Sequence, residues 1–201
     1  MTNAGPGQPS SVGTSPHALR TAARVIAAGG VVAYPTEAVY GLGCDPLDAN
    51  AVRRILAIKQ RGEDKGLILI AADFDALRPF VEILDDERMA EISSTWPGPN
   101  TWLLPARPDT PRWLTGTFDT LAVRVTGHAG AADLCRAWAN FGCGALVSTS
   151  ANLSGRPPVR TALHVRLQLH DAPDLIVAGP CGRHPRPSTI RDGRSGRLLR
   201  G

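Results

Sequence analysis

Apolar residues recur every three to four positions in some stretches and form uninterrupted runs in others, which predicts helices alternating with strands. Residues 17–30 have the helical spacing, preceded by Ser-Pro and closed by Gly-Gly. Residues 49–61 repeat this pattern behind Asp48, a residue type that caps helices. Residues 66–72 (GLILIAA) are apolar throughout, as is typical of a central strand that is buried on both faces.

The other strand candidates are short apolar runs, separated by helical stretches or by Gly and Pro turns. They span residues 31–34, 101–106, 121–125, 144–148, 174–179, 188–192 and 196–200. Residues 34–46 (YPTEAVYGLGCDP) are punctuated by glycine and proline and predict a loop. The total is about seven strands with helices between many of them. This pattern predicts an α/β (α+β) fold with a twisted mixed sheet flanked by helices.

No linker divides the chain, so we expect one layered domain over residues 16–201. Residues 1–15 are rich in Gly, Pro, Ser and Thr and predict a flexible N-terminal tail. With 43% hydrophobic and 20% charged residues the chain is typical of a soluble globular protein, not a disordered one. It has neither an apolar run of membrane-spanning length nor a secretory signal, so we expect a cytoplasmic protein that makes no membrane contact.

Cysteine and charge usage narrow the chemistry further. The four cysteines form no CxxC pair, so the sequence predicts neither a zinc site nor any other metal site, and idle thiols fit a reducing compartment. The net charge of +4 is concentrated in residues 161–201, a basic region that suits RNA, nucleotide phosphates or solvent equally well. Arginine supplies almost all positive charge, and the two lysines, Lys59 and Lys65, fall in one short stretch.

Residues 147–155 (VSTSANLSG) follow a buried strand and carry four hydroxyls and one amide but no charge. A polar turn explains this composition. A cradle for a ligand with many acceptor oxygens explains it too, because hydroxyls and successive backbone N–H groups bind phosphate. The common phosphate motifs, GxxxxGK[ST] and GxGxxG after a strand, are absent.

The remaining candidates lie at the ends of strands and helices. Arg124 interrupts an apolar strand, and it lies either on a solvated face or in a cleft where it binds an anion such as a carboxylate. Thr36 and Glu37 follow a strand, and a capping role of the threonine is the more ordinary explanation of this pair. Lys59 and Arg61 end a helix, where cations favour the helix dipole in any case.

The order of these segments carries more information than any one of them. YPTEAVYGLGCDP, KQRGEDKGLILIAA, WPGPNTW, LAVRV, STSANLSG and PSTIRD occur in the order seen in the YrdC family. From about residue 17 to residue 201 the chain resembles the short, single-domain bacterial branch of this family. The resemblance implies a twisted mixed sheet with helices on its faces and a concave, basic cleft.

The resemblance also implies an activity, that of a threonylcarbamoyl-AMP synthase, which is a nucleotidyltransferase. Such an enzyme converts L-threonine, bicarbonate (or CO₂) and ATP, which arrives with Mg²⁺, into threonylcarbamoyl-adenylate and diphosphate without a prosthetic group. A partner transferase complex then passes the threonylcarbamoyl group to adenosine 37 of tRNAs that read codons beginning with A.

Matching the family motifs position by position assigns expected roles. Thr36 would hold threonine and Arg124 would pair with its carboxylate, with Ser148 and Ser188 on the same side. Lys59 and Arg61 would be catalytic and face the triphosphate. The expected nucleotide-binding residues are Arg61, Lys65, Thr120, Ser150, Asn152 and Arg200. In longer relatives, which carry a second domain, Asn and His stand where this chain has Lys65 and Ile70.

Two other classes of function fit parts of the sequence. A non-catalytic RNA-binding module for tRNA or rRNA would use the basic C-terminal region, although 5% aromatic residues are few for a base-stacking surface. Weak RNA binding is also compatible with the synthase. A carbamoyl-transfer step, as in hydrogenase maturation proteins with a YrdC-like domain, would use carbamoyl phosphate in place of threonine, and the accessory domains of those proteins are missing here.

Overall fold

A mixed sheet of ten strands runs through the part of the chain that the computed structural model describes, residues 10–153, 155–170, 172–184 and 186–201. The strand order is β1-β8-β2-β3-β7-β4-β6-β5-β9-β10. The strands are β1 (Ser10–Val12), β2 (Val32–Pro35), β3 (Tyr40–Gly43), β4 (Ile68–Ala71), β5 (Asn100–Pro105), β6 (Thr120–Val125), β7 (Leu146–Ser150), β8 (Leu175–Val177), β9 (Thr189–Asp192) and β10 (Leu198–Arg200).

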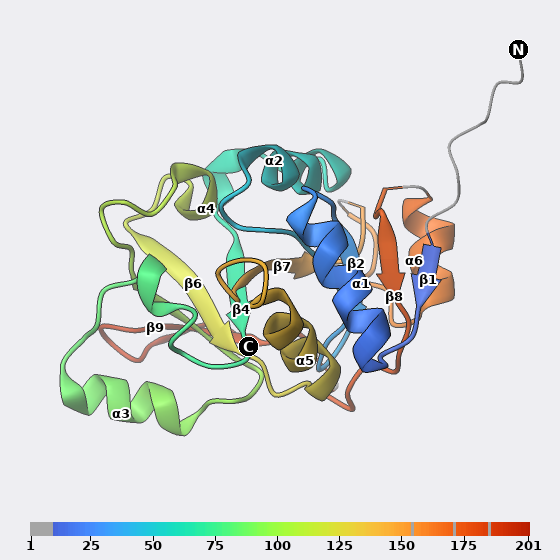
Figure 1. Ribbon diagram of the computed structural model, residues 1–201. Coiled ribbons are helices and arrows are strands. Elements are labelled where there is room, and N and C mark those ends of the chain that lie inside the picture. Colours follow the sequence, from blue (N-terminus) through green and yellow to red (C-terminus); the bar gives the residue numbers. More distant parts are fainter. Residues whose placement is uncertain (1–9, 154, 171, 185) are drawn as a thin grey trace, which may run out of the picture.

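Helices pack around this sheet. The α-helices are α1 (Pro16–Ala27), α2 (Ala49–Ile58), α3 (Asp86–Ser94), α4 (Arg112–Thr115), α5 (Ala129–Trp138) and α6 (Ala162–Leu169), with 3-10 turns η1 (Glu63–Lys65) and η2 (Arg78–Phe80). Figure 1 shows α1 and α5 side by side in front of the central strands, α6 beside β8 and α3 at the opposite end of the molecule. This arrangement confirms the predicted fold class, one layered α/β domain with a mixed sheet.

The helix starts are those that the sequence predicts. Ser15 caps α1, and its side chain accepts a hydrogen bond from the backbone N of Ala18 at 3.3 Å. Asp48 caps α2 by accepting from the backbone N–H groups of Asn50 and Ala51. Each cap satisfies a backbone donor that has no partner within the helix, and this fixes where the helix begins.

Two of the ten strands, β3 and β1, were not among the strand candidates of the sequence. β3 lies in the stretch predicted as a loop, because its glycines serve close packing and not a turn. A Cβ at Gly43 would lie 2.6 Å from the carbonyl oxygen of Val147 and 2.8 Å from Cε1 of Tyr34. β1 lies within the predicted tail and forms the edge of the sheet, because its backbone pairs with β8 in parallel register. Residues 1–9 of that tail lie outside the described residues.

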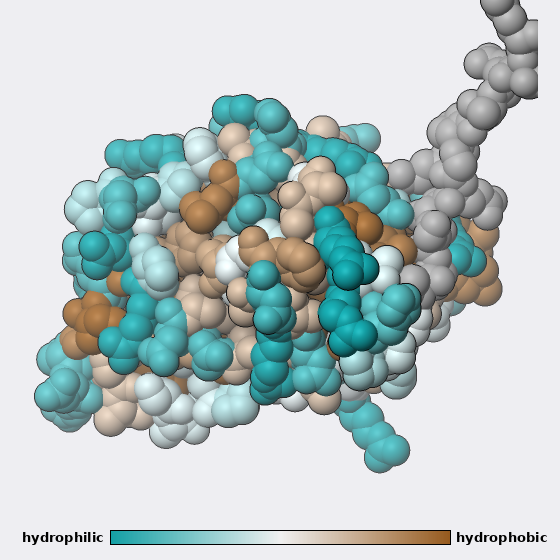
Figure 2. All heavy atoms as spheres, in the orientation of Figure 1, coloured by the Kyte–Doolittle hydropathy of each residue, from teal (hydrophilic) through white to brown (hydrophobic). Residues whose placement is uncertain are grey.

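The core is divided between the two faces of the sheet. Leu19, Ile26, Tyr34 and Trp138 belong to the cluster under α1 and α5, and a larger cluster that includes Trp102 fills the other side. Figure 2 shows mostly hydrophilic side chains over the face that carries α1 and α5, with small separate hydrophobic patches. Among the described residues, no helix is both long enough and apolar enough to cross a membrane.

Candidate functional site

A cavity of about 570 Å³ lies where the central strands and their connections meet. Its walls come from strands β3, β4, β5, β6, β7, β9 and β10. The segment after β2 and the connection between α2 and β4 complete them. Its volume is in the usual range for small-ligand sites.

Nine of the eleven predicted site residues line this cavity. They are Thr36, Arg61, Lys65, Thr120, Arg124, Ser148, Ser150, Ser188 and Arg200. The sheet order explains why residues so distant in sequence converge, because β7, β4, β6, β5, β9 and β10 are successive neighbours. Lys59 and Asn152 are the two predicted residues that do not line the cavity; they lie behind its wall.

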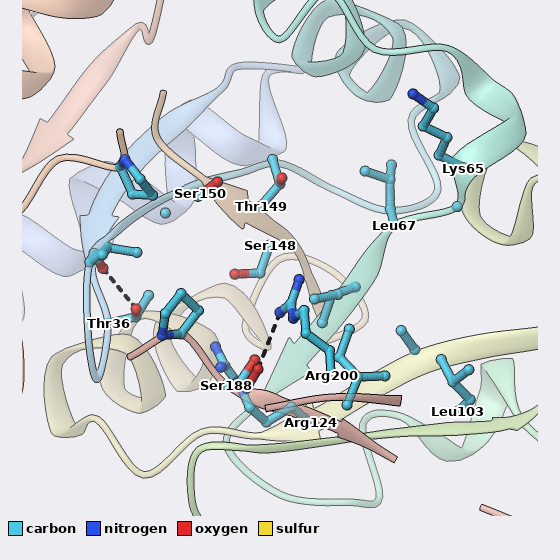
Figure 3. A pocket seen from close by; sticks show the side chains of 18 of the residues that line it. Thr36, Lys65, Leu67, Leu103, Arg124, Ser148, Thr149, Ser150, Ser188 and Arg200 are labelled. Atoms are coloured by element: carbon cyan, nitrogen blue, oxygen red, sulfur yellow. Dashed lines mark hydrogen bonds between the residues drawn. The ribbon is translucent and has the colours of Figure 1, made fainter. Parts of the chain in front are cut away.

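The two ends of the cavity differ in chemistry. Figure 3 groups Thr36, Ser148, Ser188 and Arg124 at one end, and Leu67 and Leu103 at the other, with Lys65 at the rim. Further apolar lining comes from Leu114, Phe118, Ile190 and Leu199. The cavity therefore joins a polar end suited to a small charged ligand to an end whose walls are largely apolar.

Hydroxyl groups at the polar end already have defined partners. Thr36 Oγ1 donates to the carbonyl oxygen of Val39 at 2.7 Å, which leaves the oxygen of Thr36 free to accept. Thr101 Oγ1 donates to Ser188 Oγ at 3.0 Å, which leaves the proton of Ser188 free to be donated. Arg200 Nη2 donates to the backbone oxygen of Ser188 at 3.2 Å and so anchors β10 to this end.

Arg124 lies in a buried position next to Glu37, which the sequence placed at a strand end but to which the family resemblance assigned no role. Arg124 Nη2 is 3.5 Å from Glu37 Oε2, and the side chains are 8% and 12% exposed. Glu37 Oε1 accepts from Thr126 Oγ1 at 2.8 Å and from the backbone N of Gly127 at 2.9 Å. Of the two positions left open by the sequence, Arg124 therefore occupies the cleft and not a solvated face.

The charge on Glu37 is maintained by these contacts. Burial by itself raises the pKa of Glu37, but the charge of Arg124 and the hydrogen bonds to the carboxylate outweigh burial and hold the pKa below 4.5. Neither Arg124 Nε nor Glu37 Oε2 has a hydrogen-bond partner among the described residues. The signal for Glu37 was present in YPTE, since a carboxylate beside Thr36 at a strand end is available to compensate a nearby cation.

Three further cations, Arg61, Lys65 and Arg200, line the cavity. Arg61 is tied to the backbone of the following segment, because its Nη2 donates to the oxygens of Lys65 and Gly66 at 3.1 and 2.9 Å. Burial, followed by the charges of Arg124 and Arg61, lowers the pKa of Arg200. Among the described lining residues Glu37 alone is acidic, so the cavity is electrostatically suited to anions.

Lys59 has a different environment. It is 7% exposed, and its Nζ contacts the backbone oxygens of Ser150 and Asn152 at 2.6 and 3.1 Å. Burial, and to a smaller extent the charge of Arg61, lowers the pKa of Lys59 to about 8. Asn152 faces Lys59, which is why neither side chain reaches the cavity.

Tyr40 is a residue of the cavity wall that the sequence did not single out. Its hydroxyl donates to the backbone oxygen of Gly179 at 2.7 Å and accepts from the backbone N of the same residue at 3.0 Å. The backbone N of Gly182 donates to the oxygen of Thr36 at 2.9 Å. These bonds fasten the connection between β8 and β9 to the cavity wall, and Pro187 and Ser188 of that connection line the cavity.

No three His, Cys, Asp or Glu side chains in the described part of the chain are grouped where they could hold a metal ion. Glu37 is also engaged by Arg124, Thr126 and Gly127. The donor set of the cavity therefore does not fit a metal held by the protein itself.

Comparison with known proteins identifies the family. Residues 24–201 match the Sua5/YciO/YrdC family, which carries the description "telomere recombination". The chain is 54% identical over 182 residues to a threonylcarbamoyl-AMP synthase of Nitrosococcus oceani, covering 90% of this chain and 96% of the relative. It is also 54% identical over 188 residues to the protein of the same name from Halorhodospira halophila, covering 94% and 96%.

Solved structures agree with this relationship. The crystal structure of P. abyssi Sua5 complexed with L-threonine is 35% identical, with a TM-score of 0.85 over 96% of this chain and 56% of that longer protein. E. coli YciO is 25% identical, with a TM-score of 0.82 over 96% and 95% of the two chains.

The high-identity relatives are matched over nearly their whole length, so this chain is an enzyme of the same broad class, a nucleotidyltransferase. Its resemblance to the YrdC family, first indicated by the order of its motifs, is confirmed. The chain belongs to the Sua5/YciO/YrdC family and groups with those members that are named threonylcarbamoyl-AMP synthase.

Proposed function

We propose that the chain makes threonylcarbamoyl-AMP from L-threonine, bicarbonate or CO₂, and ATP, with release of diphosphate. The observation that carries the proposal is that a hydroxyl-rich end with Arg124 and the cations Arg61, Lys65 and Arg200 line the same cavity. The names of the relatives and the threonine complex of P. abyssi Sua5 support threonine and ATP as substrates.

The polar end suits threonine. Arg124 binds the carboxylate through the edge of its guanidinium that Glu37 does not occupy, and Ser188 donates its free proton to the same group. Thr36, whose own proton is directed to Val39, accepts a hydrogen bond from the substrate. Ser148 lies between these groups and contributes a further hydroxyl.

The rest of the cavity suits ATP. The apolar walls around Leu67 and Leu103 accommodate the base, while Thr120, Ser150 and Arg200 supply hydrogen bonds to the nucleotide. Arg61 and Lys65 lie where a triphosphate extends toward the rim. This orientation brings the α-phosphate between the nucleotide end and the threonine end.

The chemistry joins two anions. The free amine of threonine forms an N–C bond to CO₂ and loses a proton, which gives a carbamate. A carbamate oxygen then forms a bond to the α-phosphorus as the bond to the β-phosphate oxygen breaks, and diphosphate leaves. Binding the reactants in line removes much of the entropic barrier, and Arg61 and Arg200 stabilise the charge that develops on the phosphate oxygens.

Mg²⁺ enters this reaction as part of the Mg–ATP substrate, in which the phosphate oxygens are its ligands. The product is a reactive mixed anhydride, which a transferase complex consumes when it modifies adenosine 37 of tRNAs that read codons beginning with A. A tRNA-directed role fits a cytoplasmic enzyme, and weak RNA binding by the basic C-terminal region is compatible with it.

The direct test is to incubate the protein with Mg–ATP, bicarbonate and threonine and to follow diphosphate release. We expect release that requires threonine, and loss of most of it in Arg124→Ala. Arg107→Ala is the matched control, because Arg107 is an exposed arginine that pairs with Asp109 away from the cavity lining. Diphosphate release that does not depend on threonine contradicts the proposal. RNA binding without any release supports the non-catalytic alternative.

A further inference from the structure

Lys59 is a buried cation that no carboxylate compensates. It caps the C-terminus of α2 and is 7% exposed, and none of the ion pairs among the described residues includes it. Four oxygens of the turn at residues 150–152 surround its ammonium instead. The distances from Nζ are 2.6 Å to Ser150 O, 3.1 Å to Asn152 O, 3.1 Å to Asn152 Oδ1 and 3.4 Å to Ser150 Oγ.

These contacts account for every proton of the ammonium. A lysine ammonium has three N–H donors and no acceptor, and the three shortest contacts, at 2.6 to 3.1 Å, use all three. Lys59 therefore has no donor left for a phosphate while the turn keeps this conformation. It is also absent from the residues that line the cavity, whereas Arg61, two positions later, is among them.

The turn in its present conformation depends on a cation. Ser150 Oγ donates to Asn152 Oδ1 at 2.5 Å, and the backbone N of Asn152 donates to Ser150 O at 3.0 Å. The Nδ2 of Asn152 is directed elsewhere, to the backbone oxygens of Leu153 and Arg156. Three strong acceptors of this turn thus converge on one point, where they repel one another unless a positive charge lies between them.

We propose that Lys59 is a positioning residue, whose ammonium holds the turn at residues 150–152 from behind the cavity wall so that Ser150 meets the nucleotide. The assignment rests on the proposed function, because it takes the cavity ligand to be ATP. It leaves Arg61 and Lys65, both on the cavity lining, to contact the triphosphate. The ammonium thus stabilises the site without touching the substrate.

The decisive measurement uses nucleotide-free protein. In Lys59→Ala we expect the amide proton of Asn152 to exchange with solvent at least about tenfold faster, since the turn loses the three hydrogen bonds that the ammonium donates to it. Methylammonium, which fits the vacated oxygen cage and donates three hydrogen bonds, is expected to restore the protection. Tetramethylammonium, which has no N–H, is the control that does not restore it.

Ligand affinity separates positioning from direct phosphate contact. For Lys59→Ala we expect calorimetry to show the same loss, about tenfold, for adenosine, AMP and ATP, because the effect of the turn on Ser150 does not depend on the phosphates. Lys65→Ala is the matched lysine control, with a loss confined to ATP. A loss for Lys59→Ala that grows from adenosine to ATP overturns the proposal.

Two outcomes keep this inference distinct from the proposed function. If Lys59→Ala does not fold, Lys59→Met retains the aliphatic stem and serves for the same exchange and affinity measurements. Unchanged exchange at Asn152 in a folded variant contradicts the positioning role even if the enzyme makes threonylcarbamoyl-AMP. Faster exchange that methylammonium reverses, in a protein that binds no nucleotide, supports the oxygen cage while the proposed function fails.

Discussion

Arg124 and Lys59 are both buried cations of the same site, but their charges are compensated in opposite ways. Arg124 has an acidic partner, with Nη2 3.5 Å from Glu37 Oε2. Lys59 has only neutral oxygens around it, the nearest at 2.6 Å. Around Arg124 there is an ion pair, so removing either partner leaves the other charge buried. Around Lys59 there are oxygen dipoles that repel one another unless the ammonium lies between them.

The different surroundings of Arg124 and Lys59 suit the ligands proposed near each of them, threonine near Arg124 and the nucleotide near Ser150. A guanidinium that shares one edge with Glu37 keeps its other edge for a carboxylate, and pairing limits the attraction for unrelated anions. A lysine ammonium is compact enough to fill a cage of carbonyl and hydroxyl oxygens, which a planar guanidinium does not match. The sparing use of lysine in this chain, at Lys59 and Lys65, is consistent with such a requirement at Lys59.

The largest effect is expected from Arg124→Ala. It leaves the Glu37 carboxylate buried without its cation, which costs about 3–5 kcal/mol of folding stability for a buried pair. It also removes the partner of the threonine carboxylate, so kcat/KM for threonine should fall about 100-fold while ATP affinity changes little. Denaturant unfolding and initial rates measure the two effects. Equal losses for threonine and ATP would contradict the assignment of Arg124 to the threonine end.

Glu37→Gln should have the next largest effect, and it has a pH signature. Glutamine keeps an acceptor for Thr126 and Gly127 but leaves the charge of Arg124 uncompensated, with a stability loss of about 1–3 kcal/mol at pH 7. Because the pKa of Glu37 is lowered in the folded protein, its charge stabilises the fold above pH 4.5, and this contribution is lost as the pH falls through the lower folded value.

Urea unfolding of wild-type protein and Glu37→Gln between pH 3 and 7 checks this signature. The stability difference between them is expected to be largest at neutral pH and to shrink in acid. A difference that does not change with pH would show that Glu37 acts through its shape and not through its charge.

Lys59 is expected to make adenosine affinity depend on pH in the alkaline range, whereas Glu37 acts on stability in acid. Its pKa is about 8 in the folded protein against an ordinary 10.5, so above pH 8 it loses the proton that completes its contacts to Ser150 and Asn152. The neutral amine has only two N–H donors for the three nearest oxygens, so one contact that orients Ser150 is lost, and adenosine affinity should fall severalfold between pH 7 and 9. Arg61 is the charged group that acts on Lys59, and Ser150 and Asn152 are neutral.

The contribution of Lys59 to folding stability should rise over the alkaline range in which adenosine affinity falls. A base whose pKa is lower in the folded protein destabilises the fold while it is charged, and this penalty lifts as the pH rises from 8 toward 10.5. Adenosine binding that weakens at alkaline pH without a matching loss of stability therefore identifies Lys59 as the titrating group. Lys59→Met should lack this alkaline change in affinity. If Lys59→Met keeps the same alkaline profile as the wild type, another group is responsible.

The sequence predicted most of the fold because helix starts and apolar runs are local signals. Ser15 and Asp48 cap the helices that they were expected to cap. β3 was missed because Gly41 and Gly43 are typical of turns, whereas here they allow the ring of Tyr34 to pack against the neighbouring strand. β1 was missed because its pairing depends on β8, more than 160 residues away.

The site was predicted less completely than the fold. Motif order was sufficient to bring together nine lining residues, but it carries no information on which charged group faces which. Glu37 stands next to Thr36 in sequence, yet its partners Thr126 and Gly127 are 89 and 90 positions distant. Lys59 was expected to face the triphosphate, and only the three-dimensional position of Asn152 shows its ammonium directed elsewhere.

The smallest effect is expected from Thr126→Val, which tests whether the surroundings of Arg124 and those of Lys59 act independently. Valine has a similar shape but cannot donate the 2.8 Å hydrogen bond to Glu37 Oε1, while the backbone N of Gly127 still can. The carboxylate keeps one anchor, so we expect a stability loss of about 1 kcal/mol and a two- to threefold rise in KM for threonine. If Glu37 orients Arg124, the change should appear in KM for threonine and leave KM for ATP and the Asn152 exchange rate unaltered. A matching rise in KM for ATP would mean that the two buried cations are coupled, and that their different compensation does not separate the two ends of the cavity.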